Sequence, residues 1–279
     1  DVILSFVDST NVVALLAARG LEVPVVIAER SAPAANLTLS RPWRLLRRIT
    51  YRRADRVVAQ TRAAARWLDE HCGTTADVIP NVLRALPAAR TEDPESARGP
   101  VVLAVGRLAW EKDLGTLIRA FAMVHGAHRD WTLVLLGEGP LREELQALVR
   151  ELGIADAVRF EGFRPDPEAW MARAAIFVLS SRFEGYPNAL LEAMAMGAAV
   201  VSSDCPSGPR EIIREGVDGR MFAVGEVAAL ASLLRELMDD APQRRRLGTA
   251  ARGVRERHAP DRIMQLWDGL LQDAVRGRS

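Results

Sequence analysis

The chain alternates short, β-rich apolar runs with longer segments of helical period along almost its whole length. Runs such as Val101–Val105, Thr132–Leu136 and Ile176–Leu179 are each followed by a segment whose apolar residues recur at helical spacing. This alternation is typical of a parallel sheet whose strands are joined by covering helices, and it predicts an α/β fold. The other predicted strands are Val2–Phe6, Val23–Ala28, Arg56–Gln60, Asp77–Ile79, Val158–Phe160, Ala199–Ser202 and Arg220–Ala223.

The segment Arg84–Pro100 breaks the alternation. It is rich in Pro, Ala and charged residues and has no apolar period, which is the composition of a linker. We therefore expect two domains, residues 1–98 and residues 99–259, with a C-terminal helix within 260–279 that packs on one or the other. The second domain has the strands of a complete doubly wound sheet, whereas the first has fewer and lacks a Gly-rich turn after its first strand. The first domain is therefore expected to be incomplete at its N-terminus.

Composition and residue spacing exclude several classes of protein. The 37 Lys and Arg residues nearly balance the 36 Asp and Glu residues, so no global basic field points to nucleic acid as a partner. No stretch reaches the roughly 20 apolar residues that a membrane-spanning helix needs. Cys72 and Cys205 match no metal-binding or redox spacing, and we expect both to be buried in a protein of a reducing compartment, the cytoplasm.

One predicted helix, Arg41–Arg53, concentrates positive charge in the first domain. At 100° per residue its arginines form one arc and its aliphatic residues form the opposite arc. One interpretation is contact with an anionic membrane surface or a phosphorylated acceptor, and the other is an ordinary solvated helix face. The arginine arc consists of Arg41, Arg44, Arg47, Arg48 and Arg52, and the opposite arc consists of Leu45, Leu46 and Ile49.

The turn after the first strand of the second domain carries two cations, Arg107 and Lys112. Loops at the carboxyl ends of parallel strands are where open α/β sheets bind ligands. Arg supplies a planar fork of donors and Lys a compact charge, so the two together suit a diphosphate. Lys112 is the only lysine among the 37 basic residues, which indicates a position that Arg does not fill. The alternative is that both residues are ordinary surface charge.

A helix is predicted to begin near Asn188 and to end at Gly197, a residue type that commonly ends helices. It follows the strand Ile176–Leu179, so its N-terminus is expected at the carboxyl edge of the sheet. The first N–H groups of a helix have no partner inside it, and those of Asn188 and Ala189 are therefore expected to bind phosphate without a side chain.

Two carboxylates flank this helix start. Glu184 precedes it and Glu192 lies about one turn inside it, so both are expected to face the same ligand. A carboxylate accepts hydrogen bonds from both hydroxyls of a vicinal diol, which suits a sugar. Two Glu residues at this spacing also occur by chance, but the loop with Gly185 and Pro187 between strand and helix strengthens the pattern.

Two further loops are expected to complete the site. Gly137 and Gly139 follow Thr132–Leu136 and would let the backbone approach a ligand, while Ser202–Glu211 follows the strand Ala199–Ser202. The alternative is that both loops are simple strand–helix turns. Arg142 stands where a dinucleotide fingerprint needs its third glycine, which disfavours a hydride-transfer enzyme. The chain has no Asp-x-Asp motif, so we expect no metal to bridge a diphosphate, and Arg107 with Lys112 would take its charge instead. No cofactor is expected either.

Several segments together carry a family resemblance. They are Gly106–Lys112, Phe160–Phe163, Glu184–Glu192 and Asp204–Glu211, with Ala28–Arg30 and Ile79–Asn81 in support. They resemble the motifs of family 4 retaining glycosyltransferases of bacterial polysaccharide and lipid-linked glycan assembly. The resemblance covers essentially the whole chain and implies the GT-B fold, an α/β architecture of two Rossmann-like doubly wound domains facing across a cleft, with a nucleotide-sugar donor mostly on the second. It implies transfer of a hexose or N-acetylhexosamine from a nucleotide diphosphate sugar to a glycan or polyprenyl-diphosphate-linked acceptor. The expected donor is a UDP-sugar.

The resemblance also implies roles for individual residues. Arg107 and Lys112 would bind the diphosphate and stabilise the departing nucleoside diphosphate, Glu184 would hold the transferred sugar, and Glu192 the ribose. Configuration would be retained by front-face attack, with the leaving phosphate taking the acceptor proton, so that no protein nucleophile is needed. The other implied substrate-binding residues are Gly185, Tyr186, Pro187, Asn188, Ala189, Gly137, Gly139 and Glu29.

The chain departs from the family at two places. Many members carry a His beside the donor sugar in the first domain, where this chain has Glu29 and Arg30, and the Gly-rich loop of that domain is absent. Two other functions stay open: a nucleotide-sugar epimerase of the same fold, and a non-catalytic module that binds nucleotide sugar or scaffolds a complex. The implied location is the cytoplasm, with the inner face of the cell membrane included through the Arg41–Arg53 helix.

Overall fold

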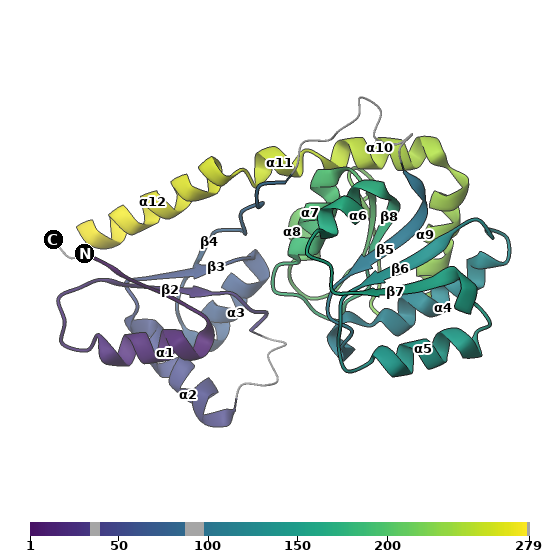
Figure 1. The fold of residues 1–279 in the computed structure, drawn as a ribbon. Coiled ribbons are helices and arrows are strands. Elements are labelled where there is room, and N and C mark those ends of the chain that lie inside the picture. Colours follow the sequence, from purple (N-terminus) through teal and green to yellow (C-terminus); the bar gives the residue numbers. More distant parts are fainter. Residues whose placement is uncertain (34–39, 87–97, 278–279) are drawn as a thin grey trace.

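The computed structural model describes residues 1–33, 40–86 and 98–277. Within these ranges the chain forms two separate parallel sheets with flanking helices, which lie side by side in Figure 1. The predicted α/β class is confirmed, and every predicted strand is present with ends that move by no more than two residues. The central part of the predicted linker Arg84–Pro100, residues 87–97, lies outside the described residues.

The N-terminal sheet contains parallel strands in the order β1-β2-β3-β4. Strand β2 is buried along its whole length, and its aliphatic residues Val26 and Ile27 are typical of a strand covered on both faces. The strands are β1 (Ile3–Phe6), β2 (Val25–Glu29), β3 (Arg56–Ala59) and β4 (Asp77–Val78), and the helices are α1 (Asp8–Ala17), α2 (Arg41–Thr50), η1 (Tyr51–Arg53) and α3 (Arg62–Cys72).

The C-terminal sheet contains parallel strands in the order β10-β9-β8-β5-β6-β7. Read from β7, this is the 3-2-1-4-5-6 order of Rossmann-type sheets, which bind ligands outside the carboxyl ends of the strands where the order reverses, here β5 and β8. The strands are β5 (Gly99–Val105), β6 (Thr132–Leu136), β7 (Val158–Gly162), β8 (Ala174–Leu179), β9 (Ala199–Ser203) and β10 (Arg220–Phe222). The helices are η2 (Trp110–Lys112), α4 (Leu114–His125), α5 (Arg142–Glu151), η3 (Ala155–Ala157), α6 (Pro167–Arg173), α7 (Asn188–Met196), α8 (Pro209–Ile212), α9 (Val227–Asp239), α10 (Ala241–Ala251) and α11 (Val254–Arg257).

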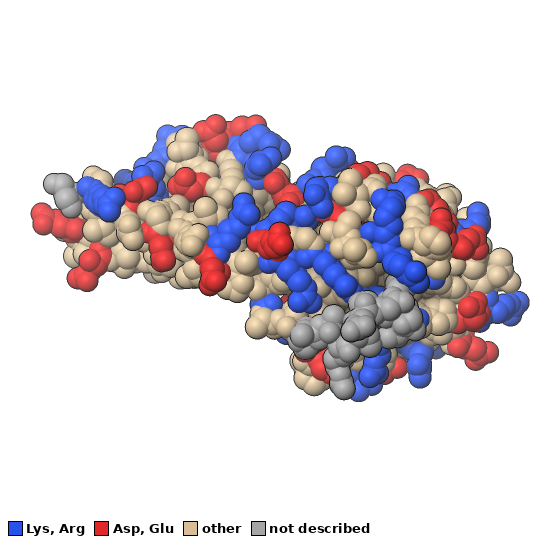
Figure 2. All heavy atoms as spheres, turned by 90° about the horizontal axis from the view of Figure 1, so that it is seen from above, with Lys and Arg blue, Asp and Glu red and all other residues tan. Residues whose placement is uncertain are grey.

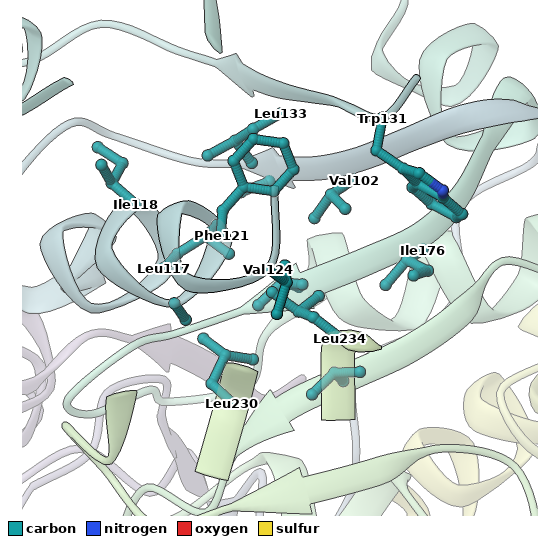
Figure 3. Packing of buried hydrophobic residues seen from close by; sticks show 14 of the residues in the cluster. Val102, Leu117, Ile118, Phe121, Val124, Trp131, Leu133, Ile176, Leu230 and Leu234 are labelled. Atoms are coloured by element: carbon teal, nitrogen blue, oxygen red, sulfur yellow. The ribbon is translucent and has the colours of Figure 1, made fainter. Parts of the chain in front are cut away.

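Helix α4 packs its apolar face against the C-terminal sheet (Figure 3). Leu117, Phe121 and Val124 recur at helical spacing and are fully buried among side chains of the strands and of α9. Burial of each such side chain stabilises the fold by roughly 2 kcal/mol. This layer fixes the loop after β5, which connects directly to α4, relative to the sheet.

The C-terminal helix α12 (Pro260–Arg276) returns to the N-terminal sheet and lies along it, as Figure 1 shows. Ile263 and Leu270 are buried against Val26 and Val58 of that sheet. The chain thus passes between the two domains a second time, and α12 holds its C-terminal end against the N-terminal domain. No helix in the described ranges has the length and apolarity that a bilayer span requires.

Helix α2 does not present its predicted arginine arc as one exposed face. Arg47 is buried, with its guanidinium 4.6 Å from the centroid of the Trp67 ring, whereas Leu45 and Ile49 are 59% and 49% exposed. The prediction was wrong because Trp43 and Leu46, not Leu45 and Ile49, pack against the N-terminal core and set the rotation of the helix about its axis. Aliphatic residues therefore share the outer face with the remaining arginines. Across the face of the molecule seen in Figure 2, many basic side chains lie next to acidic ones.

Candidate functional site

Lys112 and Glu184 meet at the point where the strand order reverses. Lys112 ends η2 in the loop after β5, and Glu184 lies in the loop after β8. The Lys112 Nζ donates a hydrogen bond of 2.6 Å to Glu184 Oε1, and both side chains are mostly buried. The two motifs that the sequence analysis treated separately therefore supply one charged pair at the edge where such sheets bind ligands.

Two serines hold this pair in place. Ser181 Oγ donates a 2.6 Å hydrogen bond to the same Glu184 Oε1, and Ser180 Oγ donates one of 2.8 Å to the carbonyl oxygen of Lys112. The other oxygen of Glu184, Oε2, accepts no hydrogen bond within the described part of the chain, which leaves it for the hydroxyls of a ligand. Sequence reasoning missed both serines, although two adjacent hydroxyls at the end of an apolar strand were a usable signal.

Arg107 stands apart from this pair. Its guanidinium donates to Glu111 Oε1 through Nε at 3.1 Å and Nη2 at 2.5 Å, and its side chain is 67% exposed. An ion pair this exposed contributes little to stability, so a ligand phosphate can replace Glu111 as the partner. Sequence reasoning missed Glu111, for which the i,i+4 spacing from Arg107 was the signal.

Gly137 and Gly139 bring the loop after β6 against the backbone of the loop after β5. A Cβ on Gly137 would overlap the carbonyl oxygen of Gly106, and one on Gly139 would overlap that of Leu108. Leu108 N also donates 2.9 Å to the carbonyl oxygen of Glu138. The close approach that these glycines allow in this structure is therefore to the protein's own cation-bearing loop.

Helix α7 begins at Asn188 and ends before Gly197, which has a left-handed φ of 81°, so the predicted bounds are confirmed. Pro187 is the residue before the first turn. The N–H groups of Asn188 and Ala189 have no acceptor inside the helix, as at every helix start, and can donate to an anion.

Glu192 lies one turn into α7 and is held by Arg84. The Arg84 Nε lies 2.7 Å from Glu192 Oε1, and Arg84 Nη2 donates 2.8 Å to Glu168 Oε2 of α6. Burial raises the pKa of the Glu192 carboxyl above its ordinary value, and Arg84 acts in the opposite direction. No described contact joins Glu192 to Glu184, and sequence reasoning missed Arg84.

Tyr186 and Gly185 fix the loop between Glu184 and α7. Tyr186 is buried, and its hydroxyl forms a 2.5 Å hydrogen bond with His258 Nε2. A Cβ on Gly185 would lie 2.9 Å from the carbonyl oxygen of Arg30 in the N-terminal domain. Tyr186 therefore offers a ligand its backbone alone, and Gly185 permits the two domains to touch.

Glu29 lies inside the N-terminal domain. Its side chain has no exposed surface; Ser31 Oγ donates 2.7 Å to Oε1 and Tyr51 Oη donates 3.1 Å to Oε2. Arg47 Nη1 lies 4.0 Å from Oε2, and burial raises the pKa of the Glu29 carboxyl above its ordinary value. In this structure Glu29 reaches the domain junction through Ser31, not with its own carboxylate.

Three polar contacts join the domains beside these loops. Thr61 Oγ1 lies 2.9 Å from Ser207 Oγ, and the backbone N–H of Arg62 donates 2.9 Å to Glu211 Oε1. Asn81 Nδ2 donates 2.7 Å to Asn188 Oδ1 at the start of α7. The loops after β3 and β4 therefore face the loops after β8 and β9, which places the carboxyl edges of both sheets at the junction.

This junction combines a lysine–carboxylate pair, an exposed arginine, a helix N-terminus and a second carboxylate. Cations and helix N–H groups suit phosphates, and carboxylates suit hydroxyls. In the described ranges, no group of three or more His, Cys, Asp and Glu side chains has a geometry that would hold a metal ion. Fold and geometry together define a two-domain α/β protein of Rossmann type with a candidate polar ligand site where its domains meet.

Comparison of the sequence with models of known protein families identifies this class. The sequence model of the family described as glycosyl transferases group 1 matches residues 88–254, and that of glycosyltransferase family 4 matches residues 1–83. The first match spans more than half of the chain, so the chain belongs to the glycosyl transferases group 1 family. The recognised resemblance is thereby confirmed at the level of the family.

Curated relatives come from bacterial glycan assembly. An exopolysaccharide phosphotransferase of Streptomyces coelicolor is 32% identical over 225 residues, which are 80% of this chain and 24% of that protein. A Campylobacter jejuni protein named GalNAc-α-(1→4)-GalNAc-α-(1→3)-diNAcBac-PP-undecaprenol α-1,4-N-acetyl-D-galactosaminyltransferase is 28% identical over 98% of this chain and 75% of its own length. Against three of the curated relatives the chain spans 24%, 46% and 37% of their lengths.

Solved structures share the two-domain architecture. The crystal structure of Anabaena HepE in complex with UDP superposes with a TM-score of 0.87 at 22% identity, over 97% of this chain and 79% of that chain. A likeness at this identity establishes the fold, and the GT-B fold predicted from the motifs is confirmed.

Proposed function

We propose that this chain is a retaining glycosyltransferase that moves a hexose or N-acetylhexosamine from a nucleotide diphosphate sugar to a glycan or lipid-linked acceptor. The observation that carries the proposal is the Lys112–Glu184 contact of 2.6 Å. It places a cation for the diphosphate and an acceptor for sugar hydroxyls within one hydrogen bond, which matches a ligand whose sugar is bonded directly to its diphosphate.

The chemistry requires stabilisation of a leaving group. The bond between the anomeric carbon and the diphosphate oxygen breaks, and negative charge develops on the nucleoside diphosphate. Lys112, Arg107 and the first N–H groups of α7 would bind that charge, and preorganised donors of this kind supply a large part of many rate enhancements.

The acceptor hydroxyl attacks the same face of the sugar. A new bond forms between its oxygen and the anomeric carbon, its proton passes to the departing phosphate oxygen, and configuration is retained. The free Oε2 of Glu184 accepts hydrogen bonds from hydroxyls of the transferred sugar, which holds the ring during the step. The step requires no protein nucleophile, no cofactor and no metal, so activity is expected to persist in excess EDTA.

A uridine nucleotide is the proposed donor. HepE, whose fold this chain shares, was crystallised with UDP. Glu192 is the proposed partner of the ribose hydroxyls, because its side chain, which is 15% exposed, lies on the helix whose N-terminus would bind the phosphates.

The same proposal includes contact with the inner face of a membrane, where a lipid-linked acceptor would reside. The outer face of α2 exposes Leu45 and Ile49 among Arg41, Arg44 and Arg48. Aliphatic side chains that insert between headgroups, ringed by cations that attract anionic lipid, characterise a peripheral membrane helix. Leu45→Glu with Ile49→Glu is expected to abolish co-sedimentation with vesicles of anionic phospholipid without lowering Tm.

Donor turnover tests the proposal. Release of UDP from UDP-glucose, UDP-galactose and UDP-N-acetylhexosamines would be measured with and without a glycan acceptor for the wild-type chain and for Lys112→Ala, Glu184→Ala and Glu192→Ala. We expect acceptor-dependent release that all three variants reduce. Turnover without acceptor would indicate a nucleotide-sugar epimerase or hydrolase, binding without turnover a non-catalytic module, and undiminished transfer in the variants would refute the site.

A further inference from the structure

The segment that follows β4 runs along helix α7. Asn81 Nδ2 donates to Asn188 Oδ1 at 2.7 Å, and Arg84 Nε lies 2.7 Å from Glu192 Oε1. Asn188 and Glu192 are four residues apart and therefore lie on one face of the helix. The segment that leads from one domain to the other thus contacts both polar side chains on this face of α7.

Arg84 divides its guanidinium between two carboxylates. The Arg84 Nε lies 2.7 Å from Glu192 Oε1, and Nη2 donates a 2.8 Å hydrogen bond to Glu168 Oε2. The two carboxylate side chains are only 15% and 20% exposed, respectively, and they come from different helices. A planar fork held at two of its nitrogens has little rotational freedom, so it fixes the orientation of what it binds.

This contact matters because Glu192 is a carboxylate that lies in a largely buried position. An ionised carboxylate is costly to bury without a partner, and it can rotate if nothing holds one of its oxygens. Arg84 takes Oε1 and leaves Oε2 for two hydroxyls. Glu168, which also faces this position from α6, adds a second negative charge that Arg84 must offset.

We propose that Arg84 is a positioning residue that turns Glu192 Oε2 toward the ribose hydroxyls of the bound nucleotide. The inference rests on the proposed role of Glu192 in donor binding. Arg84 does not touch the nucleotide; it acts through the carboxylate. Arg84, a residue of the segment between the domains, thereby affects the affinity for the donor, although it lies outside the motifs Gly106–Lys112 and Glu184–Glu192.

Binding of UDP to the full chain tests this inference by calorimetry. Arg84→Gln is expected to raise the Kd for UDP about tenfold at pH 7.5, because it leaves a charge-assisted hydrogen bond unmade. Arg84→Lys keeps the charge and loses the fork, and is expected to fall between Arg84→Gln and the wild type. Arg159→Gln removes an arginine whose side chain is 63% exposed and lies 3.6 Å from Glu161, and it serves as the matched control without effect.

A double-mutant comparison separates positioning from general damage to the fold. In a Glu192→Ala background, Arg84→Gln is expected to weaken UDP binding less than twofold further, because the side chain that Arg84 orients is gone. A full tenfold loss in that background would overturn the inference. If Glu192→Ala weakens binding and Arg84→Gln does not, the inference about Arg84 fails alone. If Glu192→Ala itself changes nothing, the ribose assignment fails and the inference with it.

The pH dependence supplies a readout that a purely structural role would not move. Loss of the Arg84 cation raises the pKa of Glu192 further, so a larger fraction of the carboxyl is protonated as the pH falls. The ratio of Kd for Arg84→Gln to wild type is therefore expected to grow between pH 8 and pH 5.5. A ratio that stays constant over this range would contradict a role through Glu192.

Discussion

Lys112 and Glu184, 72 residues apart in the chain, neutralise each other across 2.6 Å at the junction of the two domains. In the proposed function, the pair would hold a lysine and a carboxylate for different parts of one ligand without leaving either charge unpaired before the ligand binds. Arg107 is likewise paired with Glu111, so both proposed diphosphate-binding cations already have carboxylate partners. A donor diphosphate would replace Glu111, whose partner Arg107 is 67% exposed, more readily than Glu184, whose Oε1 is also bound by Ser181.

Lys112→Arg is expected to lower kcat for donor turnover about 10²-fold although the net charge is unchanged. A guanidinium is planar and larger than an ammonium, so at this mostly buried position it is expected to disturb the single Nζ–Oε1 contact. Initial rates of UDP release would measure the effect, with Arg159→Lys as the exposed control. Near-normal turnover would mean that the single lysine is an accident of composition.

Ser181→Ala is expected to raise KM for the donor about tenfold, because Glu184 loses the hydroxyl that fixes its Oε1. Thr50→Ala is the matched control: Thr50 is a buried residue of the N-terminal domain, and its hydroxyl donates 2.8 Å to the carbonyl oxygen of Leu46. Both variants lose one buried hydroxyl, so a KM that rises equally in both would argue against a role in orienting Glu184.

Arg47→Met is expected to lower the free energy of unfolding by about 3 kcal/mol, because it leaves the buried Glu29 carboxylate without a cation. Adding Glu29→Gln to this variant is expected to restore part of the loss, since no buried charge then lacks a partner. Urea unfolding would give both values. Arg44→Met, at an exposed position of the same helix, should change stability by less than about 0.5 kcal/mol, and an equal loss there would refute the buried-pair explanation.

His258 is expected to make the fold sensitive to acid. Burial lowers the pKa of its imidazole to about 4, whereas an unfolded histidine titrates near 6.5. Between these values the unfolded state binds a proton that the native state does not, so stability falls as the pH drops from about 6.5 to about 4. His258→Gln, which keeps an acceptor for Tyr186, should reduce the dependence of Tm on pH in this range; the exposed control His71→Gln should not. An unchanged dependence in His258→Gln would exclude this cause.

The local features of the fold were predictable because they depend on neighbouring residues. Strand β6 has the bounds that its run of aliphatic residues predicted, and α7 ends at Gly197, whose left-handed φ suits glycine. The family motifs also lie at the strand ends where they were expected. These elements follow from side-chain periodicity and from turn chemistry that acts over a few residues.

The orientation of α2 was not predictable from its periodicity. A helical wheel gives the angles between residues of one helix but not which arc faces the core. Trp43 and Leu46 pack inward and carry Arg47 with them, where Glu29 and Trp67 become its partners. Glu29, a candidate contact to the donor by family resemblance, is placed in the core by the same packing.

By itself the sequence determined the strand and helix pattern, the GT-B class and the loops that carry candidate site residues, because each is encoded by short-range periodicity and motif. Only the tertiary structure decided which charges are paired: Lys112 with Glu184, Arg84 with Glu192, and Arg47 with Glu29. These partners come from elements distant in the chain. The order of the strands and the contacts between the domains bring these charges together. The energy of an ion pair depends on the distance between its charges and on their burial, not on their separation along the sequence.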